Sequence, residues 1–256
     1  SLRSQFFPWL VLATGLALSG LNWLTVRLEL QRQDVARFER LKERVFDSID
    51  AHFQAAEQAL YGARALVEST GELSPSQWGR YVESVAPFWG QNVIGLAYAQ
   101  RFSRAELDAV EARLRAGGQP EFTAERDSQA AEVYLVTHVA PVERNLPALG
   151  RDLGNGTRRR AAAELAMRTG VPVITTPFGL IDGEQRVPGC LLLLPVYAAG
   201  APLNDVAQRE RALLGWVYAS IRVDVLMRAV ANVAEEQLEF EIFDGPEATP
   251  ETLVFD

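Results

Sequence analysis

Apolar residues gather in one block near the N-terminus, where residues 6–26 contain no charged side chain. At 1.5 Å per residue, a helix of about 21 residues can cross the ~30 Å hydrocarbon core of a bilayer. Trp9 and Trp23 stand near the two ends of the block, where interfacial aromatic side chains are enriched. We therefore predict a membrane anchor over residues 1–26, with a cleaved signal peptide and a buried core helix as the alternatives.

A helical stripe of apolar residues follows this block. Residues 27–70 contain no proline and one glycine, Gly62, and their apolar positions recur at intervals of three and four. We predict a stalk helix over residues 27–73 that ends near Gly71, a residue type suited to a helix C-terminus. Such a helix can pair with a second copy of itself or pack along its own domain, and the pattern does not choose between them. The stripe consists of Val35, Phe38, Leu41, Val45, Ile49, Phe53, Ala56, Leu60, Ala63 and Val67.

From Ser74 onward the pattern alternates between helical and strand periods. Ser74 and Gln77 form a capping box with Pro75 in the first turn, which predicts a helix there. Two further helices are predicted to begin at the caps Ser103 and Thr157. The other predicted elements are strands over 93–101, 133–141, 171–176, 190–197, 213–223, 238–243 and 253–255, and a helix over 224–235.

Composition excludes several classes of protein. The chain has 256 residues, of which 48% are hydrophobic and 23% charged, so disorder throughout is excluded. Its formal net charge of -8 disfavours a nucleic-acid partner, because a duplex binder needs a basic face. The single cysteine, Cys190, rules out an intrachain disulfide and a Cys-rich zinc site, and the two histidines, His52 and His138, lie far apart in sequence. We therefore expect neither a metal nor a cofactor.

The sequence lacks the common active-site motifs. It has no dinucleotide-binding glycine motif, phosphate-binding loop, zinc-protease helix or serine-nucleophile turn. Cys190 lies in an apolar run typical of a buried thiol, and His138 lies in a predicted strand. Arg158-Arg159-Arg160 could hold an anion or form a solvated face. A binding module fits better than an enzyme, because apolar strands and aromatic residues can line a cavity. A ligand-free dimerisation module is a further alternative.

Several short motifs follow one another in an order and spacing typical of a known family. They are Tyr134, Pro141-Val142-Glu143, Leu149-Gly150-Arg151-Asp152-Leu153, Arg168-Thr169-Gly170, Thr175-Thr176-Pro177-Phe178, Leu193-Leu194-Pro195-Val196-Tyr197, Gly215 and Val223-Asp224-Val225-Leu226. In these motifs the chain resembles CHASE domains, the extracytoplasmic sensory modules of histidine kinases and cyclases, including the plant cytokinin receptor kinases. The resemblance covers roughly residues 74–233.

The resemblance implies an α+β fold in which a transmembrane helix and a long stalk helix precede tandem PAS-like units. Residues 74–224 would form the membrane-distal, ligand-binding unit, and residues 225–256 would begin the membrane-proximal unit. The anchor would lie in the inner (cell) membrane, with residues after about 27 periplasmic or extracellular. The chain would form a homodimer through its stalk and lead to a second membrane span and a cytoplasmic kinase or cyclase.

The resemblance also implies a ligand site around Asp152, which matches the aspartate that binds the adenine edge of cytokinin. A carboxylate accepts from an exocyclic N–H and, when protonated, donates to a ring nitrogen. The alternative is that Asp152 only caps or turns the loop before Asn155. Ile174 matches a position whose backbone groups bind the base, and Ala219 matches a small residue that leaves room for the ligand. The remaining predicted ligand-binding residues are Tyr134 and the apolar walls Leu194 and Trp216.

One departure from the plant receptors bears on the ligand. They carry a ligand-binding threonine on the loop after the T-x-P-F segment, whereas this loop reads Asp182-Gly183-Glu184-Gln185. We interpret the chain as the ligand-binding region of a bacterial sensor histidine kinase that recognises a cytokinin-like adenine derivative. The alternative is the input domain of a diguanylate cyclase that senses a different small molecule. In either case the region is not itself catalytic.

Overall fold

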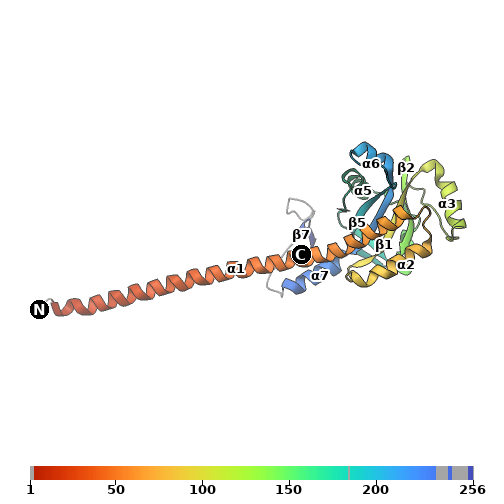
Figure 1. The fold of residues 1–256 in the computed structure, drawn as a ribbon. Coiled ribbons are helices and arrows are strands. Elements are labelled where there is room, and N and C mark those ends of the chain that lie inside the picture. Colours follow the sequence, from red (N-terminus) through yellow and green to blue (C-terminus); the bar gives the residue numbers. More distant parts are fainter. Residues whose placement is uncertain (1–2, 184, 235–241, 244–252, 256) are drawn as a thin grey trace. The chain divides into compact units, whose positions relative to one another are not determined.

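The computed structural model describes residues 3–183, 185–234, 242–243 and 253–255. The chain divides into two compact units, Ser1–Ser48 and Ile49–Asp256. Figure 1 shows the helices in the colours of the sequence. They are α1 (Arg3–Ser69), α2 (Pro75–Val85), α3 (Leu107–Ala116), α4 (Val142–Asn145), α5 (Thr157–Thr169), α6 (Val206–Ala212) and α7 (Val223–Ala234).

An antiparallel sheet of six strands forms the centre of the second unit. Its strands are β1 (Val93–Ser103), β2 (Glu132–Ala140), β3 (Val173–Ile174), β4 (Phe178–Asp182), β5 (Gln185–Tyr197) and β6 (Leu213–Arg222). The order across the sheet is β2-β1-β6-β5-β3, and β4 also pairs with β5. Two short strands, β7 (Ile242–Phe243) and β8 (Leu253–Phe255), pair with each other. The mixed α+β class predicted from the sequence is therefore correct.

The first unit is helical over residues 3–48. Among the described residues, no helix has a stretch both long and apolar enough to span a membrane. The side chains of residues 1–14, in the first half of the predicted anchor, lie outside the described part of the chain. The helix predicted over residues 27–73 is present and ends at Ser69.

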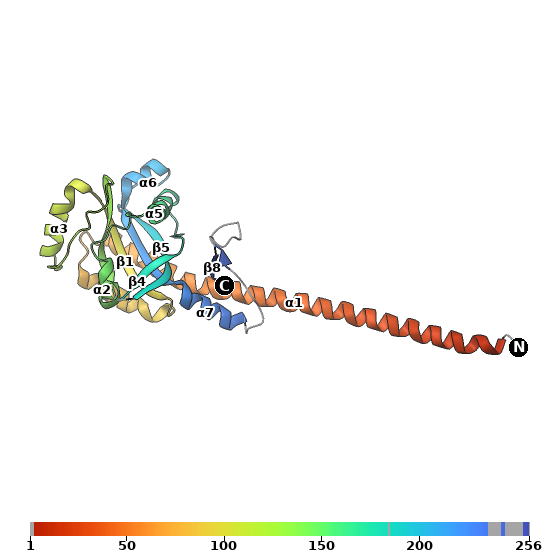
Figure 2. The ribbon, with the colours of Figure 1, turned by 180° about the vertical axis from the view of Figure 1, so that it is seen from behind.

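The end of α1 and all of α2 cover one face of the sheet (Figures 1 and 2). The predicted stripe is buried here, because Ala56, Leu60 and Ala63 are each 0% exposed. Gly62 allows α2 to approach closely, since a Cβ atom at this position would meet the hydroxyl of Tyr81. The Tyr81 hydroxyl donates to the backbone carbonyl of Ala59, which lies one turn before Gly62 on α1. The second part of the stalk helix is thus integral to the core of the second unit.

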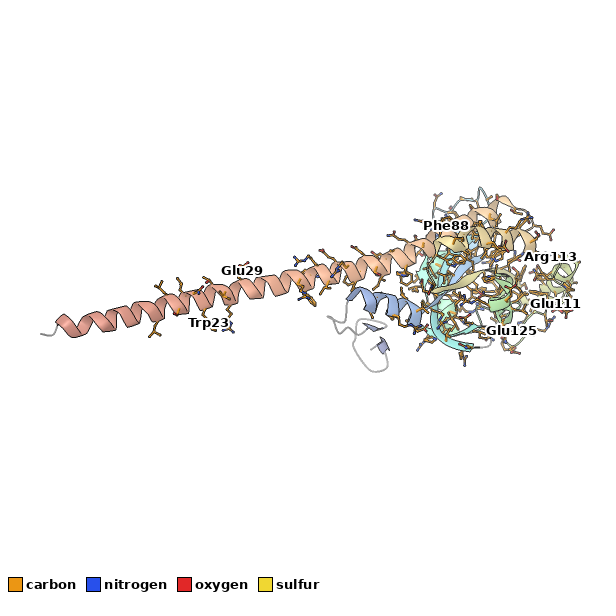
Figure 3. All side chains as sticks on the ribbon, turned by 90° about the horizontal axis from the view of Figure 1, so that it is seen from below. Trp23, Glu29, Phe88, Glu111, Arg113 and Glu125 are labelled. Atoms are coloured by element: carbon orange, nitrogen blue, oxygen red, sulfur yellow. The ribbon has the colours of Figure 1, made fainter. Side chains whose placement is uncertain are left out.

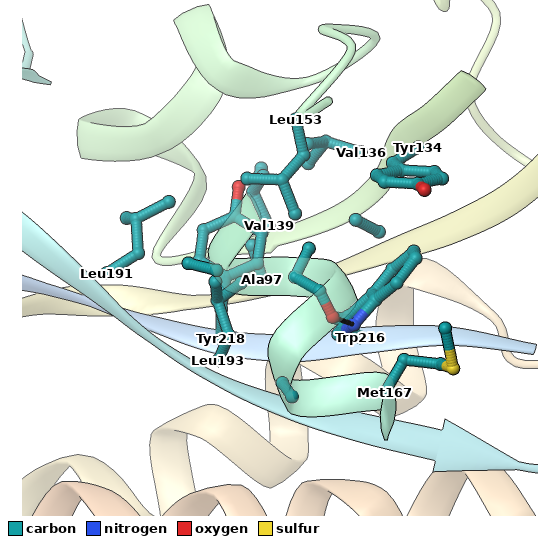
Figure 4. Close-up of a cluster of buried hydrophobic side chains, with 14 of the residues drawn as sticks. Ala97, Tyr134, Val136, Val139, Leu153, Met167, Leu191, Leu193, Trp216 and Tyr218 are labelled. Atoms are coloured by element: carbon teal, nitrogen blue, oxygen red, sulfur yellow. Dashed lines mark hydrogen bonds between the residues drawn. The ribbon is translucent and has the colours of Figure 1, made fainter. Parts of the chain in front are cut away.

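The other face of the sheet packs against α5 and the loop before it. Met167 and Ala163 of α5 contact an apolar cluster whose centre is Trp216, a fully buried residue of β6 (Figure 4). The Trp216 indole N–H donates to the Ala163 carbonyl at 2.8 Å, so the helix is fixed to the sheet by a hydrogen bond as well as by packing. A core of this kind stabilises by roughly 1.5–3 kcal/mol for each large apolar side chain that it buries.

Helix caps explain where several elements begin. The predicted capping box of Ser74 and Gln77 is confirmed, with reciprocal side-chain hydrogen bonds at the start of α2. Ser103 likewise forms a capping box, with Glu106, before α3. The prediction that Thr157 caps α5 is wrong, because Thr157 is the first residue of the helix and Gly156 occupies the cap position without a side-chain hydrogen bond.

Three elements were not anticipated, namely α4, β4 and α6. β4 pairs with the start of β5 to form a hairpin, so β5 begins at Gln185 and is longer than the predicted strand over 190–197. The strand predicted over 238–243 is confirmed at 242–243, and residues 238–241 lie outside the described residues. The strand predicted at 253–255 is confirmed.

Candidate functional site

The outer edge of β2 is covered by residues 150–153, which run antiparallel to it. Leu135 forms an isolated bridge with Asp152, and backbone N–H groups of Gly150 and Leu153 donate to carbonyl groups of β2. Gly150 has a φ of 77°, a region that favours glycine, and a Cβ atom here would meet the Thr123 carbonyl. This close approach fixes the backbone that carries Asp152.

The carboxylate of Asp152 is buried and uses only one of its oxygens. The side chain is 1% exposed. Its Oδ1 atom accepts from the backbone N–H of Tyr134 at 2.9 Å and from that of Gly154 at 2.8 Å. Its Oδ2 atom has no hydrogen-bond partner among the described residues. Burial of an unpaired carboxylate oxygen is costly, so this atom is suited to accept a hydrogen bond from a ligand.

A second carboxylate, that of Glu125, supports the same loop. Its Oε2 accepts from the backbone N–H of Asp152 at 2.7 Å, and its Oε1 accepts from the amide of Asn155 at 3.1 Å. Figure 3 labels Glu125 together with Glu111, which accepts from the backbone N–H of the preceding residue, Ala124, at 3.1 Å. Glu125 therefore holds the loop at Asp152 and at Asn155, and Glu111 holds the segment that carries Glu125. The sequence pattern indicated neither acceptor.

Asp152 lines a cavity of about 710 Å³, here called the Asp152 cavity. It lies between the sheet face that packs on α5, the β4–β5 hairpin and the Asp152 loop. The strand register explains which side chains reach it: Leu191 of β5 pairs with Ser220 of β6, and both line the cavity. The volume is within the range of about 300–1,000 Å³ that is typical of small-molecule sites.

The lining of the Asp152 cavity combines apolar side chains with hydroxyl groups. The Oγ1 atom of Thr176 is buried and, like Asp152 Oδ2, has no hydrogen-bond partner among the described residues. Tyr218 lines the cavity from β6, and Figure 4 shows its ring pointing toward Leu153. Burial raises the pKa of the Tyr218 phenol above its usual value, and Arg159 partly offsets this rise. Tyr218 is thus a neutral hydroxyl at physiological pH.

Cationic side chains outnumber acidic ones around the Asp152 cavity. Arg159 lies over the Phe178 ring at 5.5 Å and donates to the Asn155 carbonyl at 2.7 Å. Arg158 and Arg186 have no acidic partner among the described residues. The four arginines and two acids of the lining are Arg151, Arg158, Arg159, Arg186, Glu125 and Asp152. The site can therefore receive a negatively charged group as well as a hydrogen-bond donor.

An ion pair fixes the hairpin that forms one wall of the cavity. Arg144 donates to both oxygens of Asp182, at 2.8 and 2.7 Å, and so ties α4 to the end of β4. Arg222 also approaches Asp182, at 3.4 Å. The hydrogen bonds from Arg144 lower the pKa of the Asp182 carboxyl below its usual value. Asp182, the first residue of the loop that lacks the receptor threonine, therefore positions the hairpin and is not part of the cavity lining.

Tyr134 and Trp216, both predicted as ligand-binding residues, pack against each other with their ring planes tilted by 46°. Their ring centroids are 4.3 Å apart, and the Arg160 guanidinium lies over the Tyr134 ring at the same distance. Both aromatic residues belong to the apolar cluster beside the Asp152 cavity (Figure 4). Neither is among the residues that line it.

The other predicted residues lie farther from the Asp152 cavity. Leu194 pairs with Val217, and Ala219 pairs with Leu192, which places their side chains on the opposite face of the sheet. Ile174 is 46% exposed on the short edge strand β3. Of the six predicted residues, Asp152 lines the cavity, and the ligand-binding roles of all six stay predictions.

The lining residues that sequence analysis missed include Glu125, Thr176, Tyr218 and Ser220. Thr176 was present in the motif that carried the family resemblance, and Arg159 was noted as a possible anion partner. No local pattern marks Glu125 or Ser220. Among the residues that the structure describes, no three His, Cys, Asp or Glu side chains come together as a metal site requires.

Comparison with known proteins gives one family and several solved structures. The CHASE domain family matches residues 71–255. The chain is similar to the ligand-binding domain of the Pseudomonas aeruginosa amino acid chemoreceptor PctC in complex with GABA, at 12% identity and a TM-score of 0.44, over 76% of this chain and 66% of that one. It is also similar to a methyl-accepting chemotaxis protein X, at 12% identity and a TM-score of 0.45, over 79% of this chain and 68% of that one. No curated protein matches the sequence.

Proposed function

The chain belongs to the CHASE domain family, whose members are extracellular sensory domains, and we propose that its second unit binds a small organic molecule in the Asp152 cavity. One observation carries the proposal. Two residues of the lining, Asp152 and Thr176, each carry a buried polar atom, Oδ2 and Oγ1, that has no hydrogen-bond partner among the described residues. Because folded proteins rarely leave such atoms unpaired, a ligand that pairs with both accounts for them.

The leading ligand class is a cytokinin-like adenine derivative. Its exocyclic N–H would donate to Asp152 Oδ2, and a ring nitrogen would accept from the hydroxyl of Thr176 or Tyr218. The planar ring would lie against Leu191 and Phe178, which belong to the apolar part of the lining. The hydrogen bonds from Tyr134 and Gly154 to Oδ1 keep the carboxylate oriented without a ligand, so the acceptor is preorganised.

Calorimetry with isopentenyladenine tests this proposal on the chain in detergent micelles. Thr176→Val is the sharper variant, because it removes an unpaired hydroxyl and breaks no described hydrogen bond of the fold. We expect a loss of affinity of about tenfold for Thr176→Val and more for Asp152→Ala. Thr169→Val, on the exposed side of α5, is the matched control and should bind as the unaltered chain does. Absence of binding, or equal binding by all three variants, rules out the adenine ligand.

A second candidate rests on the arginines of the lining. Arg158 and Arg186 offer charge that a neutral adenine derivative does not use, which favours a ligand carrying a carboxylate or phosphate. This reading corresponds to the alternative in which the domain senses a different small molecule for a diguanylate cyclase. Arg186→Gln distinguishes the two, because it should weaken an anionic ligand at low salt and leave isopentenyladenine unaffected.

The wider architecture follows from the same proposal. Residues 1–26 would anchor the chain in the inner membrane, the stalk would join two copies, and ligand binding would favour one arrangement of the paired helices. The full-length protein would then be a histidine kinase. Reconstituted in vesicles, it should change its rate of autophosphorylation from ATP when ligand is added. Formation of cyclic di-GMP from GTP would instead identify the cyclase alternative.

A further inference from the structure

A second cavity, here called the Trp78 cavity, lies on the far side of the Asp152 loop. It has a volume of about 450 Å³ and is bounded by α2, the segment between α3 and β2, the strand β2 and α4. It shares no lining residue with the Asp152 cavity. Phe122 and Val139 contribute to a mainly apolar wall, and both are almost fully buried. The proposed function makes no use of this space.

Two polar atoms on residues of this lining are buried and unpaired. Trp78 is 0% exposed, and its indole Nε1 has no hydrogen-bond partner among the described residues. The amide of Gln119 donates through Nε2 to the Thr137 carbonyl at 3.0 Å, but its Oε1 has no described partner. One lining residue therefore carries an unpaired donor and another carries an unpaired acceptor.

The buried polar side chains next to these two atoms, His138 and Thr137, are already paired. His138 contacts the Leu73 carbonyl through Nε2 at 2.9 Å and the Thr137 hydroxyl through Nδ1 at 3.0 Å. Nε2 donates to the Leu73 carbonyl, and Nδ1 pairs with the Thr137 hydroxyl, so neither ring nitrogen is available to a ligand. This leaves Trp78 Nε1 and Gln119 Oε1 as the buried polar atoms of the lining without a described partner, beside the exposed side chains of Glu121 and Thr123.

The geometry points to the Trp78 cavity as a second small-molecule site, for a neutral apolar compound that carries a hydroxyl or a primary amide. Such a group accepts from the Trp78 indole and donates to the Gln119 carbonyl, while the carbon skeleton fills the wall formed by Phe122 and Val139. An anionic ligand is disfavoured, because the lining includes the Glu121 carboxylate and no lysine or arginine. At the mouth, Val142 and Leu146 are 49% and 55% exposed and extend the apolar surface.

One segment of the chain contributes to the walls of both the Trp78 cavity and the Asp152 cavity. Leu146 and Leu149 line the Trp78 cavity, whereas Pro147, Ala148 and Asp152 line the other. The same short stretch of backbone thus forms a wall of both. Occupation of the Trp78 cavity would shift the stretch that positions Asp152, and the two ligands would change each other's affinity by the same factor.

Indole N–H resonances of the ¹⁵N-labelled chain provide the test, with benzyl alcohol as the probe and toluene as its apolar match. We expect benzyl alcohol to shift the Trp78 signal saturably, with a Kd on the order of 1 mM for a ligand of this size. The Trp216 signal should not move, because its N–H is already bonded to Ala163. Toluene should bind about fivefold more weakly, since it pairs with neither polar atom.

Two variants complete the experiment. Gln119→Met removes the acceptor at similar volume and should reduce the preference for benzyl alcohol over toluene, and Trp78→Phe should do the same if it folds. The experiment contains no adenine derivative, so failure of the first site does not affect this test. No saturable shift of Trp78, an equal shift of Trp216, or equal affinity for the two probes overturns the proposal.

Discussion

Asp152 Oδ1 lies 2.9 Å from the backbone nitrogen of Tyr134, so one carboxylate oxygen fastens the loop to the edge of β2 while the other has no described partner. Of the two roles that its sequence context left open, the structure shows the one in the loop, and the ligand-binding role stays a proposal. It turns the loop through Gly154, as the structural alternative required, and it also presents an oxygen at the cavity lining.

The first prediction separates these roles by substitution at one position. Asp152→Ala removes the acceptor for two buried N–H groups and should lower the free energy of unfolding by about 1–3 kcal/mol. Asp152→Asn keeps an acceptor oxygen for Tyr134 and Gly154, so it should cost less stability and still abolish isopentenyladenine binding. Urea denaturation and calorimetry on both variants check this. Equal destabilisation by the two variants would contradict it.

Gly150 gives the second prediction, because its backbone is both left-handed and crowded. Gly150→Ala should destabilise the chain by about 1–3 kcal/mol, since a Cβ atom there meets the Thr123 carbonyl. Gly200 is the matched control, with a φ of 75° and open space around it, so Gly200→Ala should cost only about 1 kcal/mol. Urea denaturation compares the two. A smaller effect at Gly150 than at Gly200 would show that the loop is not constrained as described.

The third prediction concerns acid sensitivity through His138. Burial lowers the pKa of this imidazole, and the hydrogen bond to Leu73 opposes the shift more weakly. Below about pH 6.5 the unfolded chain binds a proton that the folded chain resists, so the free energy of unfolding should fall between about pH 7 and pH 5. His138→Gln should flatten this part of the curve. Denaturation at a series of pH values measures it, and an unchanged slope in the variant would refute the assignment.

The ion pair of Arg144 and Asp182 leads to the fourth prediction. Its carboxyl has a lowered pKa, so its stabilising effect is present above about pH 4 and is lost as the pH falls through the value in the folded state. A double-mutant cycle with Asp182→Asn and Arg144→Met should give a coupling of about 1 kcal/mol at pH 7. Because the ion pair fixes the β4–β5 hairpin, the variants that break the pair should also bind the ligand more weakly. If the two substitutions changed the free energy of unfolding additively, the ion pair would have no stabilising role.

Much of the secondary structure was readable because local rules decide it. Ser74 with Gln77 and Ser103 with Glu106 satisfy helix N-termini through side chains close in sequence. β4 was missed because Phe178–Asp182 is short and gains its partner only through the hairpin with β5. Thr157 was assigned as a cap by residue type, whereas the backbone places Gly156 there.

The site was less predictable, because it depends on which face of the sheet each residue occupies. The run from Cys190 to Tyr197 is buried on both faces, so it lacks the alternation that would distinguish Leu191 from Leu194. Only the register with β6 shows that Leu191 lines the Asp152 cavity and Leu194 does not. Asp152 was found because a sequence motif surrounds it. Glu125 reaches the site from a distant segment and had no such signal.

Cys190 offers a reporter on the central sheet. The thiol is 2% exposed on β5, and burial raises its pKa to about 12, so it is both shielded and protonated in the folded chain. Thiol reagents need the thiolate and access to it, so labelling will proceed only when β5 is transiently exposed. Because Cys190 is the only cysteine, the labelling rate reports how often this one strand opens. A compound that binds in either cavity should lower the rate at which Cys190 is labelled.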